Sequence, residues 1–561
     1  MAYGLEKYGA KYSQKQPYFG PDVEAKAIPS PTGGWDAISP LSAMDPKYAV
    51  SLTNWVPRPG FVELRGGYNV WAQRISSTPV ETLMCYRPAN SAEKLFAATG
   101  GSIYDVSSYA MPVLATSGKL NARWQFVNMT PAGSNSFLLA VNGQDSYLAY
   151  NGVVWSNPTI TGIVSSTFVN INLHKKRLWF IPVNSTSAWY LATDAISGTA
   201  FEFPLGSFMS KGGKLVAMAT WTVDGGNGPD DQALFITSKG QVILYKGTDP
   251  ASANTWALVG VFSLPPPIGN RCFISIGGEL AIITTQGLIP VSQALPFDPA
   301  GVRSVALTNR IQNAMLISAQ LGSSMFGWSA ITFNAQTLLI MNIPQQENVT
   351  QVQYVMNLLT GAWTQFTGWN ANCFETFNES LYFGDNVGNV NLAYAASLDL
   401  VTPIQADMKC AFNYFDDPGR IKNLTMLKPL LIADGTLTPT VSIDVDFADA
   451  SPAAPLTIIT PAGAKWDLSN WDQAQWSTGA STVNNWLSVT AIGTALATRL
   501  KVNVSGVAGS SASAAQSSVF DTGVFDTMLF DGNGAITQSG TGLVTLQLNM
   551  FEAILQFGGP I

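Results

Sequence analysis

The stretch Leu381–Ala393 reads LYFGDNVGNVNLA: an apolar run, a turn rich in Gly, Asn and Asp, and a second apolar run. Two β-propensive runs joined by residues that tolerate positive φ indicate a β-hairpin. The same pattern recurs in Lys94–Val106, Phe137–Ala149, Leu234–Leu244 and Leu280–Val291, and more weakly in Leu178–Tyr190 and Ile331–Ile343. The chain is therefore a series of hairpins that share a pattern of apolar and turn residues but not an identical sequence.

The spacing of these hairpins favours a β-propeller. Their first strands begin at Leu95, Phe137, Leu178, Leu234, Leu280, Ile331 and Leu381. The intervals are roughly 40–55 residues, and a four-stranded blade needs about 40–50 residues and a neighbour on which to bury its faces. The sequence predicts an all-β fold with about six or seven blade-like units. A β-sandwich or a string of smaller β-domains is the alternative.

Composition points to a protein that binds partner proteins. Charged residues make up only 12% of the 561 positions, and there are 16 Trp, 17 Tyr and 28 Phe. Little charge leaves much neutral surface, which partner subunits cover more often than water does. The net charge of −7 argues against sequence-independent binding of nucleic acid, which needs clustered cations. The one local basic run, Lys175-Lys176-Arg177, is expected to be a solvated strand end.

Cysteine usage and hydropathy suggest a chain that is neither secreted nor membrane-bound. Four cysteines, Cys85, Cys272, Cys373 and Cys410, are far apart and form no CxxC pair, so they are expected to be small core residues in a reducing compartment. The first residues are charged and rich in tyrosine where a signal peptide needs an apolar run. No stretch has the roughly 18 apolar residues of a membrane span, so no membrane segment is expected.

The chain divides by composition into six parts. We expect an extended N-terminal arm (1–34), strands of a flanking β-domain (35–75), the propeller (76–395), the rest of the flanking β-domain (396–504), a Ser/Gly-rich insertion (505–540) and a C-terminal strand (541–561). The arm is rich in proline and tyrosine and is expected to become ordered on a neighbouring surface. Thr308–Gly322 is the one convincing helix, with Thr308 as its cap and Gly322 at its end.

Several segments resemble one known family. Asn54-Trp55 followed by Arg65-Gly66-Gly67-Tyr68 is similar to the opening of tail nozzle (tubular tail) proteins of short-tailed bacteriophages, in which such a turn leads into the propeller. The segments 81–86, 121–128, 174–180, 240–250, 267–273 and 361–375 also look similar to this family. Together they span roughly residues 35–500. They are turns and strand faces, so they indicate a family without marking any chemistry.

The resemblance implies a structural virion protein. Proteins of this family form a ring, expected here to be a homohexamer, below the portal and adaptor proteins. The ring forms the distal DNA-ejection channel and carries tail fibres or spikes. By resemblance the chain would be made in the host cytoplasm and reside in the virion tail, and DNA would pass through without specific binding. A carbohydrate-binding or carbohydrate-cleaving β-propeller is the alternative, supported only by the abundance of aromatic residues.

The residue types for catalysis are sparse, and we expect no enzyme, no catalytic or metal residues and no cofactor. His174 is the only histidine and has lysines beside it, so a structural role is expected. Gly206–Lys214 (GSFMSKGGK) lacks the spacing and the terminal Ser or Thr of a phosphate-binding loop. Trp466, Trp471 and Trp476, at intervals of five, suggest repeated turns with buried indoles.

Paired acids are the remaining candidates for chemistry. Sugar-cleaving propellers use two carboxylates. The candidate pairs are Asp230-Asp231, Asp416-Asp417, and Asp444 with Asp446. Asp444, Asp446 and Asp449 are also candidate calcium ligands, but the glycine-punctuated spacing of a dedicated calcium loop is missing. Such acids usually lie in turns and at strand edges, where they are solvated or cap the turn, and we expect this role.

Overall fold

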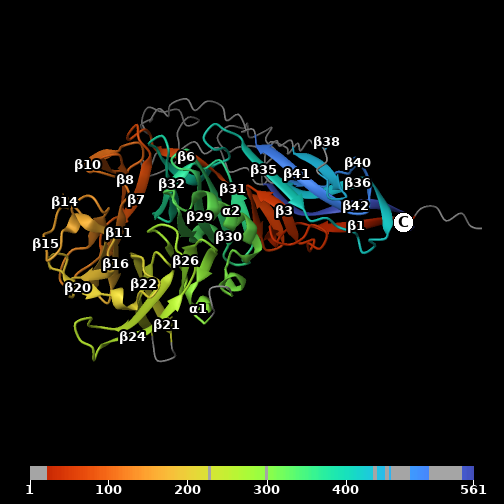
Figure 1. The fold of residues 1–561 in the computed structure, drawn as a ribbon. Helices are drawn as coiled ribbons and strands as arrows, with labels where there is room; N and C mark the ends of the chain where they lie inside the picture. Colours follow the sequence, from red (N-terminus) through yellow and green to blue (C-terminus); the bar gives the residue numbers. More distant parts are fainter. Residues whose placement is uncertain are drawn as a thin grey trace, which may run out of the picture.

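The computed structural model describes residues 22–224, 229–296, 301–433, 439–448, 454–455, 481–504 and 546–560. These residues form a β-propeller joined to an elongated β-sandwich (Figure 1). The Trp466, Trp471 and Trp476 run and the 505–540 insertion lie outside the described residues, as do residues 1–21 of the expected arm. Among the described helices none is long and apolar enough to cross a membrane.

Six small antiparallel sheets form blades around the propeller axis. The first blade holds β7 Val80–Tyr86, β8 Lys94–Thr99, β9 Ser102–Asp105 and β10 Val113–Ser117. The second holds β11 Gln125–Met129, β12 Phe137–Val141, β13 Leu148–Tyr150 and β14 Trp155–Ser156. The third holds β16 Phe168–His174, β17 Arg177–Pro182, β18 Ser187–Tyr190 and β20 Phe201–Pro204. A short parallel pair, β15 (Ile160–Thr161) and β19 (Gly198–Thr199), lies beside them.

The other three blades complete the set of small sheets. They are β21 Leu215–Asp224, β22 Pro229–Thr237, β23 Gln241–Gly247 and β24 Trp256–Ser263; β25 Phe273–Ile276, β26 Glu279–Thr284 and β27 Gly287–Pro290; and β32 Ala371–Phe377, β33 Ser380–Asp385 and β34 Val390–Ala396 with β6 Gly67–Ala72. One more blade-like unit, β28 Ser329–Phe333, β29 Leu338–Gln346, β30 Thr350–Asn357 and β31 Trp363–Phe366, lies between the last two. The propeller expected from the hairpin spacing is confirmed.

The predicted hairpins occupy equivalent places in most units. Six of them are the second and third strands of a blade, because the short Gly and Asn turns connect those strands. Ile331–Ile343 differs, since it forms β28 and β29, the first and second strands of its unit, around the short helix η5 (Asn334–Gln336). The weak hairpin signal there reflects a helical turn in place of a Gly turn.

The sandwich packs two sheets around a separate hydrophobic core. One sheet holds β1 Asp22–Pro29, β4 Trp55–Arg58, β5 Phe61–Leu64, β36 Arg420–Ala433, β39 Ser481–Val483, β40 Leu487–Gly493 and β42 Leu546–Pro560. The other continues from β31 through β2 Gly34–Trp35, β3 Tyr48–Thr53, β35 Ile404–Cys410, β41 Leu496–Val504, β37 Thr440–Val445 and β38 Ala454–Pro455. Leu52, Leu424, Leu500 and Leu555 are buried between the sheets. A second β-domain built from both flanks of the propeller is thus confirmed.

Two expected boundaries are wrong. Residues 22–29, assigned to the arm, form β1, which pairs with β42 along its whole length. Val23, Ala25 and Ala27 alternate with charged residues there, but of the described side chains of β1 only Ile28 is buried, so this alternation does not mark a buried face. Residues 67–72, assigned to the flanking domain, form β6, the outer strand of the last blade, through pairing with β34. This pairing joins distant parts of the chain, and no local pattern reveals it.

The expected helix is present with a different start. Asn309–Ile311 form a short 3-10 helix, η4, and α2 covers Gln312–Gly322. Thr308 does not cap it, because its hydroxyl accepts a hydrogen bond from the backbone N–H of Leu288 instead. α2 packs between the β25–β27 blade and the β28–β31 unit. The remaining short helices are η1 Ser165–Thr167, η2 Gly206–Phe208, α1 Val291–Ala294 and η3 Val302–Val305.

Candidate functional site

The innermost strands of the propeller units enclose a cavity of about 720 Å³ on the axis. Its lining mixes apolar and uncharged polar side chains, such as Phe126 and Asn172, with the charged Arg87, Arg271 and Glu375. Adjacent blades share no hydrogen-bonded ladder here, so side chains bridge them. Thr82 donates to the carbonyl of Ala122 over 2.6 Å, and the amide of Asn172 donates to the carbonyl of Met218 over 3.1 Å. The polar lining is therefore used to hold blades together.

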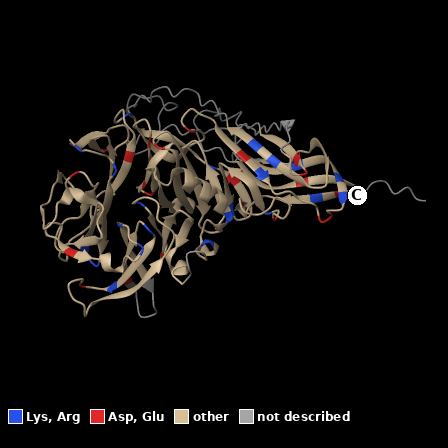
Figure 2. Cartoon of the chain, in the orientation of Figure 1, with Lys and Arg blue, Asp and Glu red and all other residues tan. Residues whose placement is uncertain are grey.

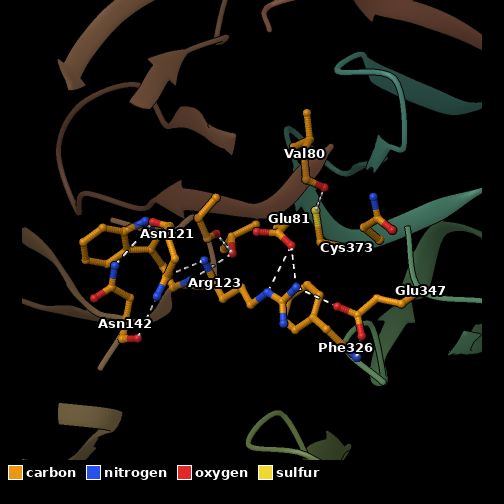
Figure 3. Close-up of polar contacts among 12 residues, drawn as sticks. Val80, Glu81, Asn121, Arg123, Asn142, Phe326, Glu347 and Cys373 are labelled. Carbon is orange, nitrogen blue, oxygen red and sulfur yellow. Dashed lines mark hydrogen bonds and ion pairs between the residues drawn. The ribbon is translucent and has the colours of Figure 1, made fainter. Parts of the chain in front are cut away.

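An ion-paired cluster forms around Arg123, next in sequence to Trp124, which lines the cavity (Figure 3). Its Nη2 lies 2.9 Å from Oε1 of Glu81, on β7, and 2.7 Å from Oε1 of Glu347, which follows β29. The guanidinium Cζ stands 4.3 Å from the ring centre of Phe326, which follows α2. Three other segments of the chain thus contact this one cation.

Arg271 completes this arrangement from the opposite blade. It donates to Thr82 Oγ1 over 2.6 Å and to the carbonyl of Trp124 over 2.9 Å, and its Cζ lies 5.0 Å from the ring centre of Phe326. Burial lowers the pKa of Arg271. We call Glu81, Arg123, Arg271, Phe326 and Glu347 the axis cluster. It joins the first, second and fifth blades and the β28–β31 unit, so it closes the propeller across its axis.

A second charged group lies where the cavity meets an adjoining cavity of about 500 Å³. Arg87 Nη2 donates to Glu375 Oε1 and to the carbonyl of Thr376, both over 2.6 Å, and its Nε lies 3.7 Å from Oε1 of Glu93. Burial raises the pKa of Glu375, and the Arg87 charge opposes that rise. Sequence reasoning missed this group, because its residues come from distant strands. The arginine engages both carboxylates, so the group links β7 to β32.

His174 lies in the interior of the β16–β20 blade and faces β21. Its Nδ1 is 3.1 Å from Thr220 Oγ1, its ring meets Trp256 edge-on, and Nε2 is buried without a hydrogen-bond partner among the described residues. Burial lowers the pKa of His174 to about 4, and the nearby Asp231 only partly opposes this. Asp231 itself is bound by Lys175 at 3.1 Å. The imidazole is therefore neutral near pH 7 and has no acid partner.

The basic run at residues 175–177, expected to be a solvated strand end, lies at the turn between β16 and β17. Lys175 and Lys176 have φ values of 48° and 58° and connect β16 to β17. Lys175 pairs with Asp231, and Arg177 lies 3.2 Å from Asp249. The run therefore presents no concentrated patch of free cations for a phosphate backbone.

The acids of each candidate pair have different partners in the structure. Asp444 is buried and pairs with Lys409 at 2.7 Å. Asp446 accepts hydrogen bonds from the backbone N–H groups of Thr494 and Ala495 in a turn. Asp416 lies in a turn with φ of 66°, and Asp417 is 3.9 Å from Arg420. Asp449 and the side chain of Asp230 lie outside the described residues.

The cysteines and the glycine-containing segment that starts at Gly206 are part of the protein's packing and turns. All four cysteines are buried and unbridged, and burial raises the pKa of each thiol. Gly206–Phe208 form a single 3-10 turn. Within the described ranges no group of three or more His, Cys, Asp or Glu residues could hold a metal ion.

A buried polar network lies at the joint between propeller and sandwich. Arg65 and Asp399 are buried and form two parallel hydrogen bonds, Nη1 to Oδ1 at 2.9 Å and Nη2 to Oδ2 at 2.6 Å. Arg65 Nε donates to Asn54 Oδ1 over 2.8 Å, and the amide of Asn54 donates to the carbonyl of Gln405 over 2.7 Å. Arg65 Nη2 also donates to the carbonyl of Thr367. This network ties β3, β31 and β35 to one guanidinium.

Two glycines allow the chain to pass this network closely. A Cβ on Gly67 would collide with the carbonyl oxygen of Leu398, and one on Gly368, whose φ is 99°, would collide with the Asp399 carboxylate. Both positions therefore require glycine. Asn54 and the Arg65–Tyr68 turn, which the sequence analysis singled out, thus lie at the joint.

Comparisons with known proteins add no family. No family model matches the chain, and no curated protein matches it. Among solved structures, the computationally designed Ika8 protein is similar with a TM-score of 0.34 and 9% identity, covering 58% of this chain and 99% of that one. The extracellular domain of the putative hybrid two component system BT4673 from B. thetaiotaomicron has a TM-score of 0.36 and 10% identity, covering 60% and 41%. Likeness this distant carries no argument about function.

Proposed function

We propose that the chain is a structural virion protein, a subunit of a ring-shaped tail nozzle of the kind found in short-tailed bacteriophages. In this proposal about six copies form a ring below the portal and adaptor proteins in the virion tail. The ring encloses the distal part of the DNA-ejection channel and carries tail fibres or spikes. Each subunit has a structural role in this ring, and that role requires no catalytic or cofactor-binding residues.

The observation that carries the proposal is the buried joint around Arg65. A conduit that opens under load needs subunits whose domains keep their relative position. A bidentate arginine–carboxylate pair in a desolvated site fixes both distance and orientation. Here that pair acts together with a sheet that runs without interruption from β31 through β2 and β3 to β35. Asn54 and Arg65, two of the residues that resemble the nozzle family, take part in this joint.

The axis cluster bears on where DNA would pass. Arg123 and Arg271 cross the propeller axis and are engaged by Glu81, Glu347 and backbone carbonyls. The propeller is therefore a packed body with a small internal cavity, and in this proposal DNA passes through the centre of the ring and outside each propeller.

No observation favours the carbohydrate alternative. A sugar-cleaving site needs two carboxylates free to act as acid and base or nucleophile. Of the acids that line the two cavities, Glu93 and Glu375 are engaged by Arg87, and Glu379 is the one acid that remains. The structural role therefore has the better support among the described residues.

Native mass spectrometry of the purified full chain tests the proposal. We expect a main species of about six copies that persists at physiological salt, because a channel subunit must close a ring. A single-chain species at all concentrations would contradict the proposal. Binding of an oligosaccharide by such a single chain would instead support the alternative.

A further inference from the structure

The outer edges of four consecutive blades are open. Strands β10, β14, β20 and β24 each end their sheet and pair on one side only within the described part of the chain. Two other edges are covered by the chain itself, since β2 and β3 extend the sheet beyond β31, and α1 and η3 pack on β27. We call the four open edges and their adjoining turns the open rim. It lies on the side of the propeller away from the sandwich (Figure 1).

The open rim is apolar. Large hydrophobic side chains are exposed on all four edges: Met111, Val113 and Leu114 near β10, Val153 and Val154 before β14, Phe201 on β20, and Leu258, Val259 and Val261 on β24. Val153 is 85% exposed and Met111 68%. Single exposed apolar residues are ordinary, but a series on neighbouring open edges marks an interaction surface.

The open rim also carries little charge, with Glu202 on β20 as its exposed acid. Residues 106–118, 146–174 and 250–270, which include three of the four edges, contain no Asp, Glu, Lys or Arg. Figure 2 shows charged residues along the strands of the sandwich and long uncharged stretches on the outer propeller edge. Nucleic acids, acidic peptides and anionic lipid surfaces are recognised through clustered cations. Three of the four edges supply none, and the turn after β20 supplies Lys211 and Lys214. Its complement is another neutral, apolar surface.

We infer that the open rim is the contact surface for a second copy of this chain. The inference rests on the proposed ring and names the face that each subunit offers to its neighbour. A second copy matches the rim in chemistry, because only 12% of the chain is charged. Covering an open blade edge with another part of the same protein also occurs within the chain, where β2 and β3 cover the edge of β31. Burying the exposed side chains of β24 and its neighbours drives this association.

Size-exclusion chromatography with light scattering on full-length protein tests this surface. The variant Leu258→Lys/Val261→Lys places two charges on the β24 edge, and Val153→Lys places one on the β13–β14 turn. We expect each variant to need at least a tenfold higher concentration for assembly, because desolvating the introduced ammonium opposes contact. Leu359→Lys is the matched control, since Leu359 is 72% exposed in the β30–β31 turn, outside the rim, and should assemble like the unmodified chain.

The outcomes separate this inference from the proposed function. Normal assembly of both rim variants, with near-UV circular dichroism like that of the unmodified chain, overturns the inference while the ring stands. A single-chain species for the unmodified protein overturns both. Loss of assembly in Leu359→Lys as well as in the rim variants also overturns the inference, because the effect would not be specific to the rim. Val153→Lys provides the test on its own if the double variant does not fold.

Discussion

At the residue scale, Arg65 shows how one side chain can set the relation between two domains. Its guanidinium is fully buried, forms the two-bond pair with Asp399, and lies 5.1 Å from the ring centre of Trp369. Lysine offers no planar fork for two parallel bonds. The pair is therefore specific in geometry as well as in charge.

Loss of this pair should destabilise the whole chain. We expect Asp399→Asn and Arg65→Met each to lower the free energy of unfolding by about 3–5 kcal/mol, because each leaves a buried charge without its partner. Urea unfolding followed by tryptophan fluorescence measures this. Lys428→Ala is the control, since Lys428 and Glu552 form a partly exposed pair at 2.5 Å, worth about 0–1 kcal/mol. Equal losses in all three variants would contradict the role assigned to Arg65.

His174 makes a prediction about pH. Its folded pKa of about 4 lies below the ordinary value of 6.5, so the unfolded chain binds the proton more tightly. Stability from this group is complete above about pH 6.5 and falls as the pH drops towards 4, by roughly 1.4 kcal/mol per pH unit at most. We expect His174→Gln to lose part of the pH dependence of the unfolding midpoint between pH 6.5 and 4. An unchanged slope in the variant would show that another group is responsible.

At the element scale, the hairpin turns were predictable and the non-local pairings were not. Gly240 and Gly287 are expected from the sequence to have positive φ, and they have φ values of 78° and 126°. By contrast, β6 pairs with β34 and β1 pairs with β42, although the paired strands are far apart in the sequence. The sequence of one strand does not indicate which distant strand will pair with it. For the same reason neither the axis cluster nor the Arg65–Asp399 pair could be predicted.

In strand β42 the alternation of apolar residues predicts the wrong buried residue at one position. Alternation from Leu546 through Leu548 predicts that Met550 is buried, but Phe551 is buried in its place. The pairing with β36 shifts there by one residue, because Leu430 is opposite Met550 and Leu431 is opposite Leu548. A β-bulge reverses the faces of every residue beyond it, and its position follows from packing and not from the local sequence.

The two turn glycines should tolerate substitution poorly. A Cβ on Gly240 would collide with the carbonyl oxygen of Leu264, and one on Gly287 with the hydroxyl of Thr308. We expect Gly240→Val and Gly287→Val each to cost more than the ~1 kcal/mol of ordinary glycine propensity. Gly361→Val is the control, because Gly361 has φ of 69° with open space around its Cα. Differential scanning calorimetry should then show larger losses at the first two positions than at the control, and equal losses would contradict the steric argument.

At the scale of the whole molecule, the charge distribution predicts weak binding of DNA. A conduit must release the duplex, and phosphates are held by Lys and Arg through counterion release. The chain carries a net charge of −7, and the arginines of the axis cluster are engaged. Fluorescence anisotropy with a labelled duplex should detect no more than weak binding at low salt. Sub-micromolar binding with a steep dependence on salt would indicate a DNA-gripping role instead.

The most direct measurement of the proposed role is an electron-microscopic image of the purified full chain. The account predicts a closed ring of about six subunits with a central hole, in which each propeller keeps one orientation relative to its sandwich because the Arg65 network and the shared sheet hold the joint. Isolated single chains without a ring, or propellers and sandwiches in many relative orientations, would contradict it.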